Sequence, residues 1–461
     1  MLDFPDVDCD SDLEDESSED LQHEFKGNKI TLPKINRKID ARLRKETIIE
    51  CGGKEKNIWL LYDSKRNLDI QINDPEDVYE LAKIFLWGGA KRDKNLETYL
   101  SYKGYFEGKR NLKAWWLPAV KDALSSPVKL FYNPSGKCPN KCLTCFSDDY
   151  RRFSLEDSVA KETMDQIVNL PIFWMNLGGC ELTFYPLYFE FAKKAIDNGI
   201  QVSSAFSGVG LTKDLAEKIK DLGIKAKVSL DGPKKINDIQ RPGTYEPAIN
   251  AIETFRELNY PVRINMVHTS LNNQEETIDE MFELAVKHGA AGIDFSIVRP
   301  KGSAITNNLM IPIEDYKNGK VKSVINRFIN HPYIKQYGLK AHVNRNLLTL
   351  DKVEPKPCQI LGVHGSCGRY TMGINMDGTI DGCIFLKDEY IPKTNVNSSE
   401  LFTNSDYILN VWQNDKTFAK IREYTKKEPC DNCKKKKIEF ARGCQACADY
   451  YGGVDPATYL H

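Results

Sequence analysis

The chain has 461 residues, 41% of which are hydrophobic, and a formal net charge of −1 at pH 7. This length suits two to three domains, and a charge so close to zero gives no reason to expect nucleic acid as a partner. The sequence contains no run of about 18 apolar residues, so we expect neither a transmembrane helix nor a membrane partner.

Residues 1–45 are expected to form a flexible tail, because residues 1–24 are acidic and Ser-rich and the residues after them are basic. The N-terminus lacks the basic and apolar regions of a secretory signal peptide. Thirteen cysteines in a long chain without such a signal indicate metal binding rather than disulfides. We therefore expect a cytoplasmic protein.

Residues 46–112 are expected to form a small α/β module. Residues 57–62 and 68–72 have the composition of strands, and the second segment alternates between apolar and polar side chains. A helix is predicted over residues 78–87, where an apolar face ends at a pair of glycines. A second helix is predicted near residues 96–102.

Residues 125–300 alternate between strand and helix patterns, which predicts an α/β fold with a parallel sheet and right-handed crossovers. Functional sites in such folds lie at the C-terminal ends of the strands. Residues 301–354 are expected to form a bridging helical region, and residues 355–461 a cysteine-rich domain. The predicted strands are 128–133, 172–177, 200–206, 224–230, 261–268 and 291–298, and the predicted helices are 156–169, 186–198, 212–222, 245–258 and 274–288.

Three cysteines follow the first of these strands with the spacing C-x3-C-x2-C: Cys138, Cys142 and Cys145. Three thiolates so close together can bind three irons of a cubane cluster and leave the fourth iron open for another ligand. A zinc site or three incidental thiols is the alternative interpretation. The loop resembles the signature of radical S-adenosylmethionine (SAM) enzymes, although Thr144 stands where many members have an aromatic residue, and Phe146 follows the third cysteine instead.

The resemblance implies a partial (β/α)6 barrel that is open on one side for substrate. In that family the open iron of a 4Fe–4S cluster chelates the amino and carboxylate groups of SAM, whose reductive cleavage gives a 5′-deoxyadenosyl radical. Gly178, Gly179 and Glu181 resemble the family's Gly-Gly-Glu-Pro motif, which contacts the SAM amino group. Here Cys180 is inserted before the glutamate and Leu182 replaces the proline.

Two further strand ends resemble SAM-binding stretches of the family. Ser229 begins a Ser-Leu-Asp-Gly sequence, and Arg241 lies downstream of it. Ser229 and Arg241 are candidates for holding the ribose or the carboxylate of SAM, since arginine can bind a carboxylate through two hydrogen bonds. Asp231 can instead brace the loop. Ser207 stands in a turn similar to the family's Thr-Asn-Gly turn, with a plain turn as the alternative.

The C-terminal block contains a second set of cysteines, and their spacing resembles the opening and middle of the SPASM domain, which extends many radical SAM enzymes. The resemblance implies a first auxiliary 4Fe–4S cluster bound by Cys358, Cys367, Cys383 and Cys447. It also implies a second cluster bound by Cys430, Cys433 and Cys444, with one open or non-cysteine ligand.

Two other assignments of the C-terminal cysteines remain open. One is a single auxiliary cluster. The other is a zinc site, because Cys430, Cys433, Cys444 and Cys447 also have a spacing that suits four zinc-binding thiolates.

A SPASM-type extension implies a peptide or protein substrate. The topology of residues 46–112 resembles the winged-helix-like element that binds the leader of a ribosomally made precursor peptide as an added strand. We therefore expect a radical SAM maturase that abstracts hydrogen from the core peptide and forms a thioether or carbon–carbon crosslink. An electron donor such as flavodoxin or ferredoxin would be a further partner.

The alternatives within the radical SAM class are an anaerobic sulfatase maturase, a peptide epimerase and a small-cofactor synthase. Sulfatase maturases carry an aspartate just after the cysteine that matches Cys383, and Ile384 occupies that place here. From a different class, the chain could be a non-catalytic iron–sulfur or zinc scaffold that binds a peptide. The intact Gly178-Gly179 pair and the Ser229 stretch disfavour that interpretation.

Overall fold

In the computed structural model the chain divides into two units. Met1–Lys38 and Glu76–Asn111 form the first, and Ile39–Pro75 and Leu112–His461 form the second. In the first unit the structure describes one antiparallel hairpin, β1 (Asp20–Phe25) and β2 (Asn28–Pro33). The structure describes residues 20–25, 28–33, 41–49, 55–63, 68–72, 112–116, 120, 123–343, 367–386, 394–424, 444–452 and 455–460.

The second unit begins with a four-stranded sheet in the order β5-β4-β3-β6. The strands predicted at 57–62 and 68–72 are present as β4 and β5. The hairpin of the first unit and the start of β3 lie inside the segment predicted to be a flexible tail. The helices predicted at 78–87 and 96–102 lie outside the described residues. The strands are β3 (Ala41–Ile49), β4 (Glu55–Asp63), β5 (Leu68–Ile72) and β6 (Leu112–Trp116).

Two buried arginines on β3 join this small sheet to the rest of the unit. Arg42 and Arg44 are each 0% exposed. Arg42 donates hydrogen bonds to the carbonyl oxygens of Val168 and Leu170 at the end of helix α3 (Asp157–Asn169). Arg44 donates to carbonyl oxygens just before the large sheet's first two strands: Ser126, Pro127 and Pro171. A buried guanidinium needs such acceptors, so these contacts fix β3 to the larger fold.

The larger sheet has nine strands in the order β13-β12-β11-β10-β9-β8-β7-β14-β15. β7 to β12 are parallel and neighbour one another in chain order, which confirms the predicted parallel sheet. β13 and β14 extend it as further parallel strands, and β15 pairs antiparallel with β14. The strands are β7 (Lys129–Tyr132), β8 (Trp174–Leu177), β9 (Gln201–Phe206), β10 (Lys225–Ser229), β11 (Arg263–His268), β12 (Gly292–Ile297), β13 (Lys340–Val343), β14 (Thr371–Ile374) and β15 (Ile380–Asp381).

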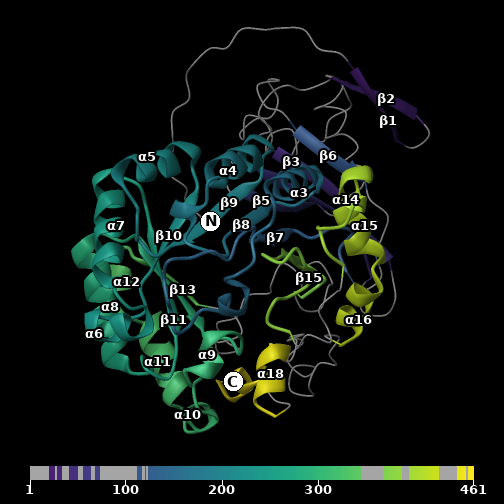
Figure 1. Ribbon diagram of the computed structural model, residues 1–461. Helices are drawn as coiled ribbons and strands as arrows, with labels where there is room; N and C mark the ends of the chain where they lie inside the picture. The colour runs from purple at the N-terminus through teal and green to yellow at the C-terminus, as the bar shows by residue number, and fades with distance from the viewer. Residues whose placement is uncertain are drawn as a thin grey trace. The chain divides into compact units, whose positions relative to one another are not determined.

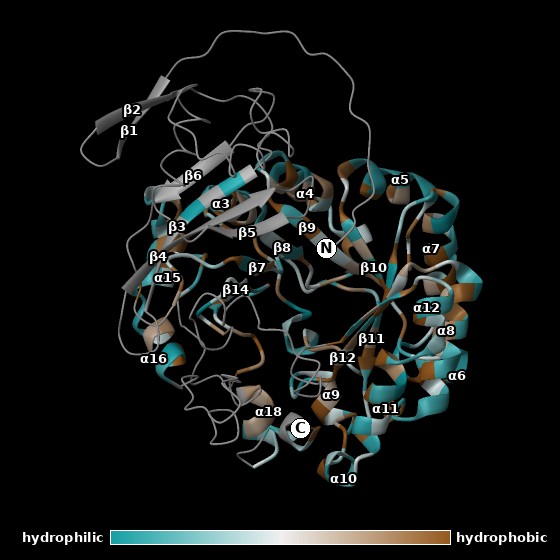
Figure 2. Ribbon diagram, turned by 180° about the vertical axis from the view of Figure 1, so that it is seen from behind, coloured by the Kyte–Doolittle hydropathy of each residue, from teal (hydrophilic) through white to brown (hydrophobic). Residues whose placement is uncertain are grey.

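Helices separate successive strands of this sheet and cover it (Figure 1). Those facing the observer in Figure 2 carry both hydrophilic and hydrophobic residues, as amphipathic covering helices do. The helices between the strands are α3, α4 (Tyr188–Asp197), α5 (Lys213–Leu222), α6 (Lys234–Gln240), α7 (Tyr245–Glu257) and α8 (Glu275–His288). The region predicted to be a helical bridge contains α9 (Ser303–Thr306), α10 (Ile313–Lys317), α11 (Lys320–Ile329) and α12 (Pro332–Gln336).

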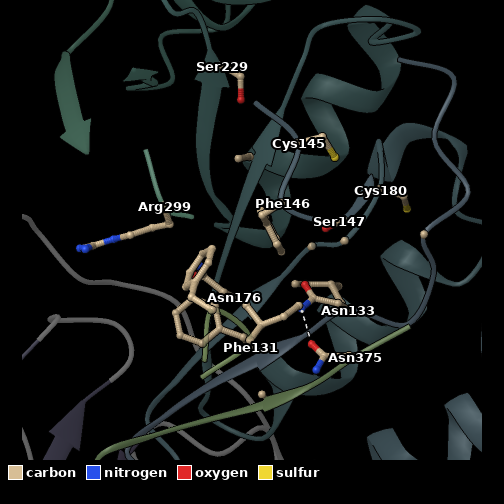
Figure 3. Close-up of a pocket in the computed structure, with 18 of the residues that line it drawn as sticks. Phe131, Asn133, Cys145, Phe146, Ser147, Asn176, Cys180, Ser229, Arg299 and Asn375 are labelled. Carbon is tan, nitrogen blue, oxygen red and sulfur yellow. Dashed lines mark hydrogen bonds between the residues drawn. The ribbon is translucent and has the colours of Figure 1, made fainter. Parts of the chain in front are cut away.

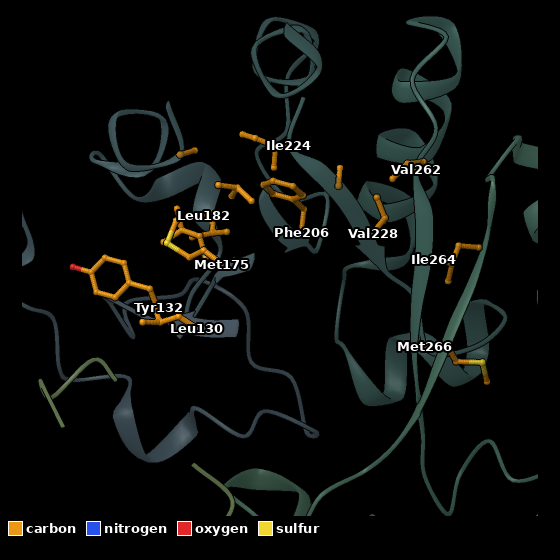
Figure 4. Close-up of a cluster of buried hydrophobic side chains, with 14 of the residues drawn as sticks. Leu130, Tyr132, Met175, Leu182, Phe206, Ile224, Val228, Val262, Ile264 and Met266 are labelled. Carbon is orange, nitrogen blue, oxygen red and sulfur yellow. The ribbon is translucent and has the colours of Figure 1, made fainter. Parts of the chain in front are cut away.

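The period-two alternation of the strands decides which side chains form the core and which face a cavity. On β11, Ile264 and Met266 belong to the hydrophobic core (Figure 4), whereas Asn265 and Val267 line the cavity. Successive side chains of a strand point to opposite faces. The parallel sheet therefore presents one apolar face to the helices and one more polar face to the cavity.

The C-terminal part packs on the same unit. Gln166 of α3 donates to the carbonyl oxygens of Leu401 and Asn404, and the buried Trp412 indole donates to Leu124 O at 2.8 Å. None of the described helices is long and apolar enough to span a membrane. The helices here are α14 (Glu400–Thr403), α15 (Tyr407–Asn414), α16 (Lys416–Tyr424) and α18 (Gln445–Tyr450).

Candidate functional site

A cavity of about 680 Å³ lies at the C-terminal ends of the parallel strands (Figure 3). It is bordered both by the loops that follow β7, β8 and β10 and by the cysteine-rich block. Cys358, Cys430 and Cys433 lie outside the described residues, and Cys447 is buried and is not among the lining residues. The predicted site residues that line the cavity are Cys138, Cys142, Cys145, Gly178, Gly179, Glu181, Ser229, Arg241, Cys367, Cys383 and Cys444.

Hydrogen bonds from neighbouring loops hold the three-cysteine loop in place. Leu143 N donates to Gln240 O at 2.8 Å, at the end of α6. The Asn140 side chain donates to Ser207 Oγ at 2.9 Å, in the turn after β9. Arg151 donates to Asn140 O and pairs with Asp148. The loop is thus fixed to several neighbouring segments, which orients its three thiols toward one cavity.

The Gly-Gly turn after β8 passes very close to the chain that leads into the cysteine loop. Gly179 has a φ of +100°, and a Cβ at this position would lie 2.7 Å from Ser135 O. Both the positive φ and the close approach require glycine. The turn therefore packs directly against the chain that leads into the cysteine loop, and both of its glycines line the cavity.

Glu181 is 3% exposed, and it borders the cavity. Its Oε2 accepts a hydrogen bond from Ser207 N at 2.7 Å, and its Oε1 accepts one from the Thr183 hydroxyl at 3.4 Å. Burial raises the pKa of Glu181, and these hydrogen bonds oppose that effect. The carboxylate thus also connects the turns after β8 and β9.

Arg241 lies between a carboxylate and a thiol of the loop. Its Nε is 2.6 Å from Asp231 Oδ2, and its Nη1 is 3.7 Å from Cys142 Sγ. Asp231 is 0% exposed, and its Oδ1 accepts from Val267 N at 2.8 Å. Burial lowers the pKa of Arg241, but Asp231 and Cys142 more than offset this and raise it. Asp231 thus braces Arg241 against the cysteine loop.

The C-terminal cysteines come together in two pairs. Cys367 and Cys383 share a side-chain hydrogen bond, as do Cys444 and Cys447 at the start of α18. The two pairs are close enough for Cys444 to raise the pKa of Cys383. Arg299, which follows β12, donates from Nη1 to Cys447 Sγ at 3.1 Å. Four thiols of the cysteine-rich block therefore gather beside the end of the sheet.

The sequence analysis missed two features of this cavity. Arg299 comes two residues after the end of β12, so the strand-end rule could have identified it. Asp381 is 1% exposed and accepts from Asn375 Nδ2 at 2.5 Å, and burial raises its pKa to about 7. No sequence signal marked Asp381, because the β14–β15 hairpin that positions it was not predicted.

The three thiols of the loop suit an iron–sulfur cluster. Within the described part of the chain, no three His, Cys, Asp or Glu side chains are close enough to hold a single metal ion. In a cubane each thiolate binds its own iron, so the sulfurs stand farther apart than ligands of one ion. The loop offers sulfur donors alone, which are the ligands that iron–sulfur clusters select.

The comparisons with known proteins agree with this chemistry. Residues 132–285 match the model of the radical SAM superfamily. The mycofactocin maturase MftC of Mycobacterium tuberculosis is 24% identical over 347 residues, which cover 72% of this chain and 81% of the relative. An AdoMet-dependent heme synthase of Methanosarcina barkeri is 24% identical over 341 residues, which cover 70% of this chain and 93% of the relative.

A solved structure extends the similarity to the fold. Streptococcus suis SuiB, bound to its precursor peptide SuiA, superposes with a TM-score of 0.62 at 16% identity. The match covers 92% of this chain and all of the other. The cysteine loop, the Gly-Gly turn and strands β8 to β11 fall within the segment that matches the family model. Residues 132–285 of this chain thus form a radical SAM domain.

Proposed function

We propose that this protein is a maturase of a ribosomally made precursor peptide. The observation that carries the proposal is that one cavity is bordered by the three-cysteine loop, by the Gly-Gly turn and by thiols of the C-terminal block. A cavity between a radical source and an electron acceptor suits the oxidation of a substrate side chain. We interpret the open sheet as the partial (β/α)6 barrel of the superfamily.

The radical SAM domain implies SAM and a catalytic 4Fe–4S cluster, which together supply a 5′-deoxyadenosyl radical when bound. Cys138, Cys142 and Cys145 would hold the cluster. Gly178 and Gly179 would present main-chain groups to SAM, and Glu181 would accept a hydrogen bond from its amino group. Ser229 and Arg241 would hold its ribose or carboxylate.

Arg241 is suited to this role because its position is already fixed. The Asp231 carboxylate binds Nε, so another edge of the guanidinium faces Cys142 and the cavity. Each charge-assisted hydrogen bond to SAM would contribute roughly 1.5–3 kcal/mol.

The C-terminal cysteines would bind auxiliary 4Fe–4S clusters. Our assignment places Cys358, Cys367, Cys383 and Cys447 at the first cluster, and Cys430, Cys433 and Cys444 at the second. The contact between Cys367 and Cys383 supports the first group. The contact between Cys444 and Cys447 brings the two groups together. A zinc ion at the second group is the alternative.

The printed names of the relatives support a peptide as substrate. MftC is called a maturase, and SuiB was solved with a precursor peptide. In this chain, residues 46–112 would bind the leader. Within the described residues β5 pairs with β4 alone, so its other edge can accept an added strand. A flavodoxin or ferredoxin would supply electrons.

A second candidate is the modification of a small molecule, which the similarity to a heme synthase supports. The cavity volume of about 680 Å³ would hold either a small cofactor or a peptide side chain. Deleting residues 46–112 separates the two, because only peptide modification needs a leader-binding module. A variant that still modifies its substrate without these residues would favour the small molecule.

Metal analysis of the reconstituted protein tests the cluster assignment. Changing Cys138, Cys142 and Cys145 together to Ala should remove about four irons, one cubane, and leave the auxiliary iron in place. Dithionite-reduced parent protein should convert SAM to 5′-deoxyadenosine, and this variant should not. A parent that contains one zinc and only four irons would contradict two auxiliary clusters.

A further inference from the structure

Arg299 stands out among the cations of the cavity because its direct partner is a sulfur. Its Nη1 donates to Cys447 Sγ at 3.1 Å. Among the described residues no carboxylate lies within ion-pairing distance of it, whereas Arg241 has Asp231 at 2.6 Å. In Figure 3 its guanidinium extends away from the Asn133 and Asn375 side of the cavity.

A partly buried guanidinium without a carboxylate needs another anion, because an unpaired charge away from water is unfavourable. The groups that face Arg299 are Cys444, Cys447 and Asp455. Asp455 lies at the same cysteine group, since its carboxylate accepts a hydrogen bond from Cys444 N. Cys447 Sγ is the group to which Arg299 donates directly.

We propose that Arg299 is a positioning residue that donates a hydrogen bond to the Cys447 ligand of an auxiliary cluster and raises the reduction potential of that cluster. The inference rests on the proposed function, because it needs Cys447 to bind a cluster. A positive charge near the cluster stabilises the reduced form, which carries one more negative charge, and hydrogen bonds to ligand sulfurs act in the same direction.

A raised potential has a defined use in crosslink formation. The substrate first loses a hydrogen atom to the deoxyadenosyl radical. Closing the new bond then removes one proton and one electron from the substrate radical. The electron would reduce the auxiliary cluster and the proton would pass to solvent. The cluster would then pass this electron to the electron-transfer partner and so return to its oxidised state.

The test measures the potential of the auxiliary cluster in full-length protein. The Cys138, Cys142 and Cys145 to Ala background removes the signal of the catalytic cluster. In that background, at the midpoint potential of the cluster in the parent protein, Arg299→Gln should lower the ratio of reduced to oxidised auxiliary cluster about tenfold. This ratio corresponds to a midpoint potential that is about 59 mV lower for a one-electron couple. Arg299→Lys, which keeps the charge, should shift the ratio less. Lys193→Gln, which removes an exposed cation on α4, should not change it.

A second measurement leaves Arg299 in place, so it does not depend on whether the Arg299→Gln protein assembles its auxiliary cluster. In the same background, labelling arginine with ¹⁵N should change the nitrogen coupling in the pulsed electron paramagnetic resonance spectrum of the reduced auxiliary cluster. A missing arginine coupling, or an unchanged potential in Arg299→Gln, would overturn the inference and leave the proposed function standing. A parent without auxiliary iron would instead overturn the proposed function.

Discussion

The site at the three-cysteine loop, called the loop site, and the site at the C-terminal cysteines are built in similar ways. They differ in the charges around their arginines. In each, an arginine beyond the end of a strand reaches a cysteine sulfur: Arg241 reaches Cys142 at 3.7 Å, and Arg299 reaches Cys447 at 3.1 Å. Asp231 balances Arg241, whereas no described carboxylate pairs with Arg299. The site of Arg241, whose charge Asp231 balances, suits a ligand that brings its own charges. The site of Arg299 suits a cluster that must accept an electron.

Both sites also depend on a close approach of main chains. A Cβ on Gly179 would lie 2.7 Å from Ser135 O, and a Cβ on Gly382 would lie 2.7 Å from Gly368 N. The first contact joins the Gly-Gly turn to the cysteine loop. The second brings the residue before Cys383 against the residue after Cys367. In each site a glycine permits the approach that sets the spacing of the thiols.

Single cysteine variants should separate the two sites most strongly. Cys142→Ala should abolish conversion of SAM to 5′-deoxyadenosine, because it removes a ligand of the catalytic cluster. Cys447→Ala should retain SAM cleavage and lose peptide modification. Product analysis by mass spectrometry measures both. Equal loss of SAM cleavage in the two variants would mean that the sites do not act separately.

Breaking the Asp231–Arg241 pair should destabilise the loop site. Asp231→Asn leaves Arg241 largely buried without its counter-charge, so we expect a loss of about 3 kcal/mol in the free energy of unfolding. Asp197→Asn is the matched control, because its pair with Lys193 on α4 is exposed and should contribute less than about 1 kcal/mol. Denaturant titration compares the two variants. Equal losses in the free energy of unfolding would reject the bracing role of Asp231.

Adding a methyl group at either glycine should disturb one site and spare the other. Gly179→Ala combines a φ of +100° with a main-chain clash, and should cost about 1–3 kcal/mol and weaken SAM binding. Gly382→Ala should instead lower the auxiliary iron content. Calorimetric SAM titration and iron analysis of both proteins provide the comparison. Weakened SAM binding in both variants would contradict the assignment of Gly382 to the second site.

The smallest effect is expected at Cys180, which lines the cavity but is no part of either cysteine group. Burial, followed by the nearby Cys138, raises the pKa of Cys180 to about 12, so its thiol stays neutral. Cys180→Ala should therefore leave the iron content unchanged. A loss of about four irons, one cubane, would instead make it a ligand.

The regular part of the fold was predictable because period-two strands and amphipathic helices are local patterns. Helix α3 occupies Asp157–Asn169 where 156–169 was predicted, and β10 occupies Lys225–Ser229 within the predicted 224–230. The loop site was predictable for the same reason, since its three thiols lie within eight residues and the glycines follow the next strand. The domain boundaries and the roles of the individual site residues remain predictions.

Other features were decided by tertiary structure alone. Arg42 and Arg44 look like ordinary strand residues, yet they are buried against carbonyl groups about 80 to 160 residues away in the chain. Arg299 meets Cys447 across 148 residues. Such contacts depend on how separate elements are brought together, and no local pattern encodes them. The sequence by itself therefore determined the three-cysteine loop and the parallel sheet, because both are local patterns, whereas packing decided which charges stand beside which sulfurs.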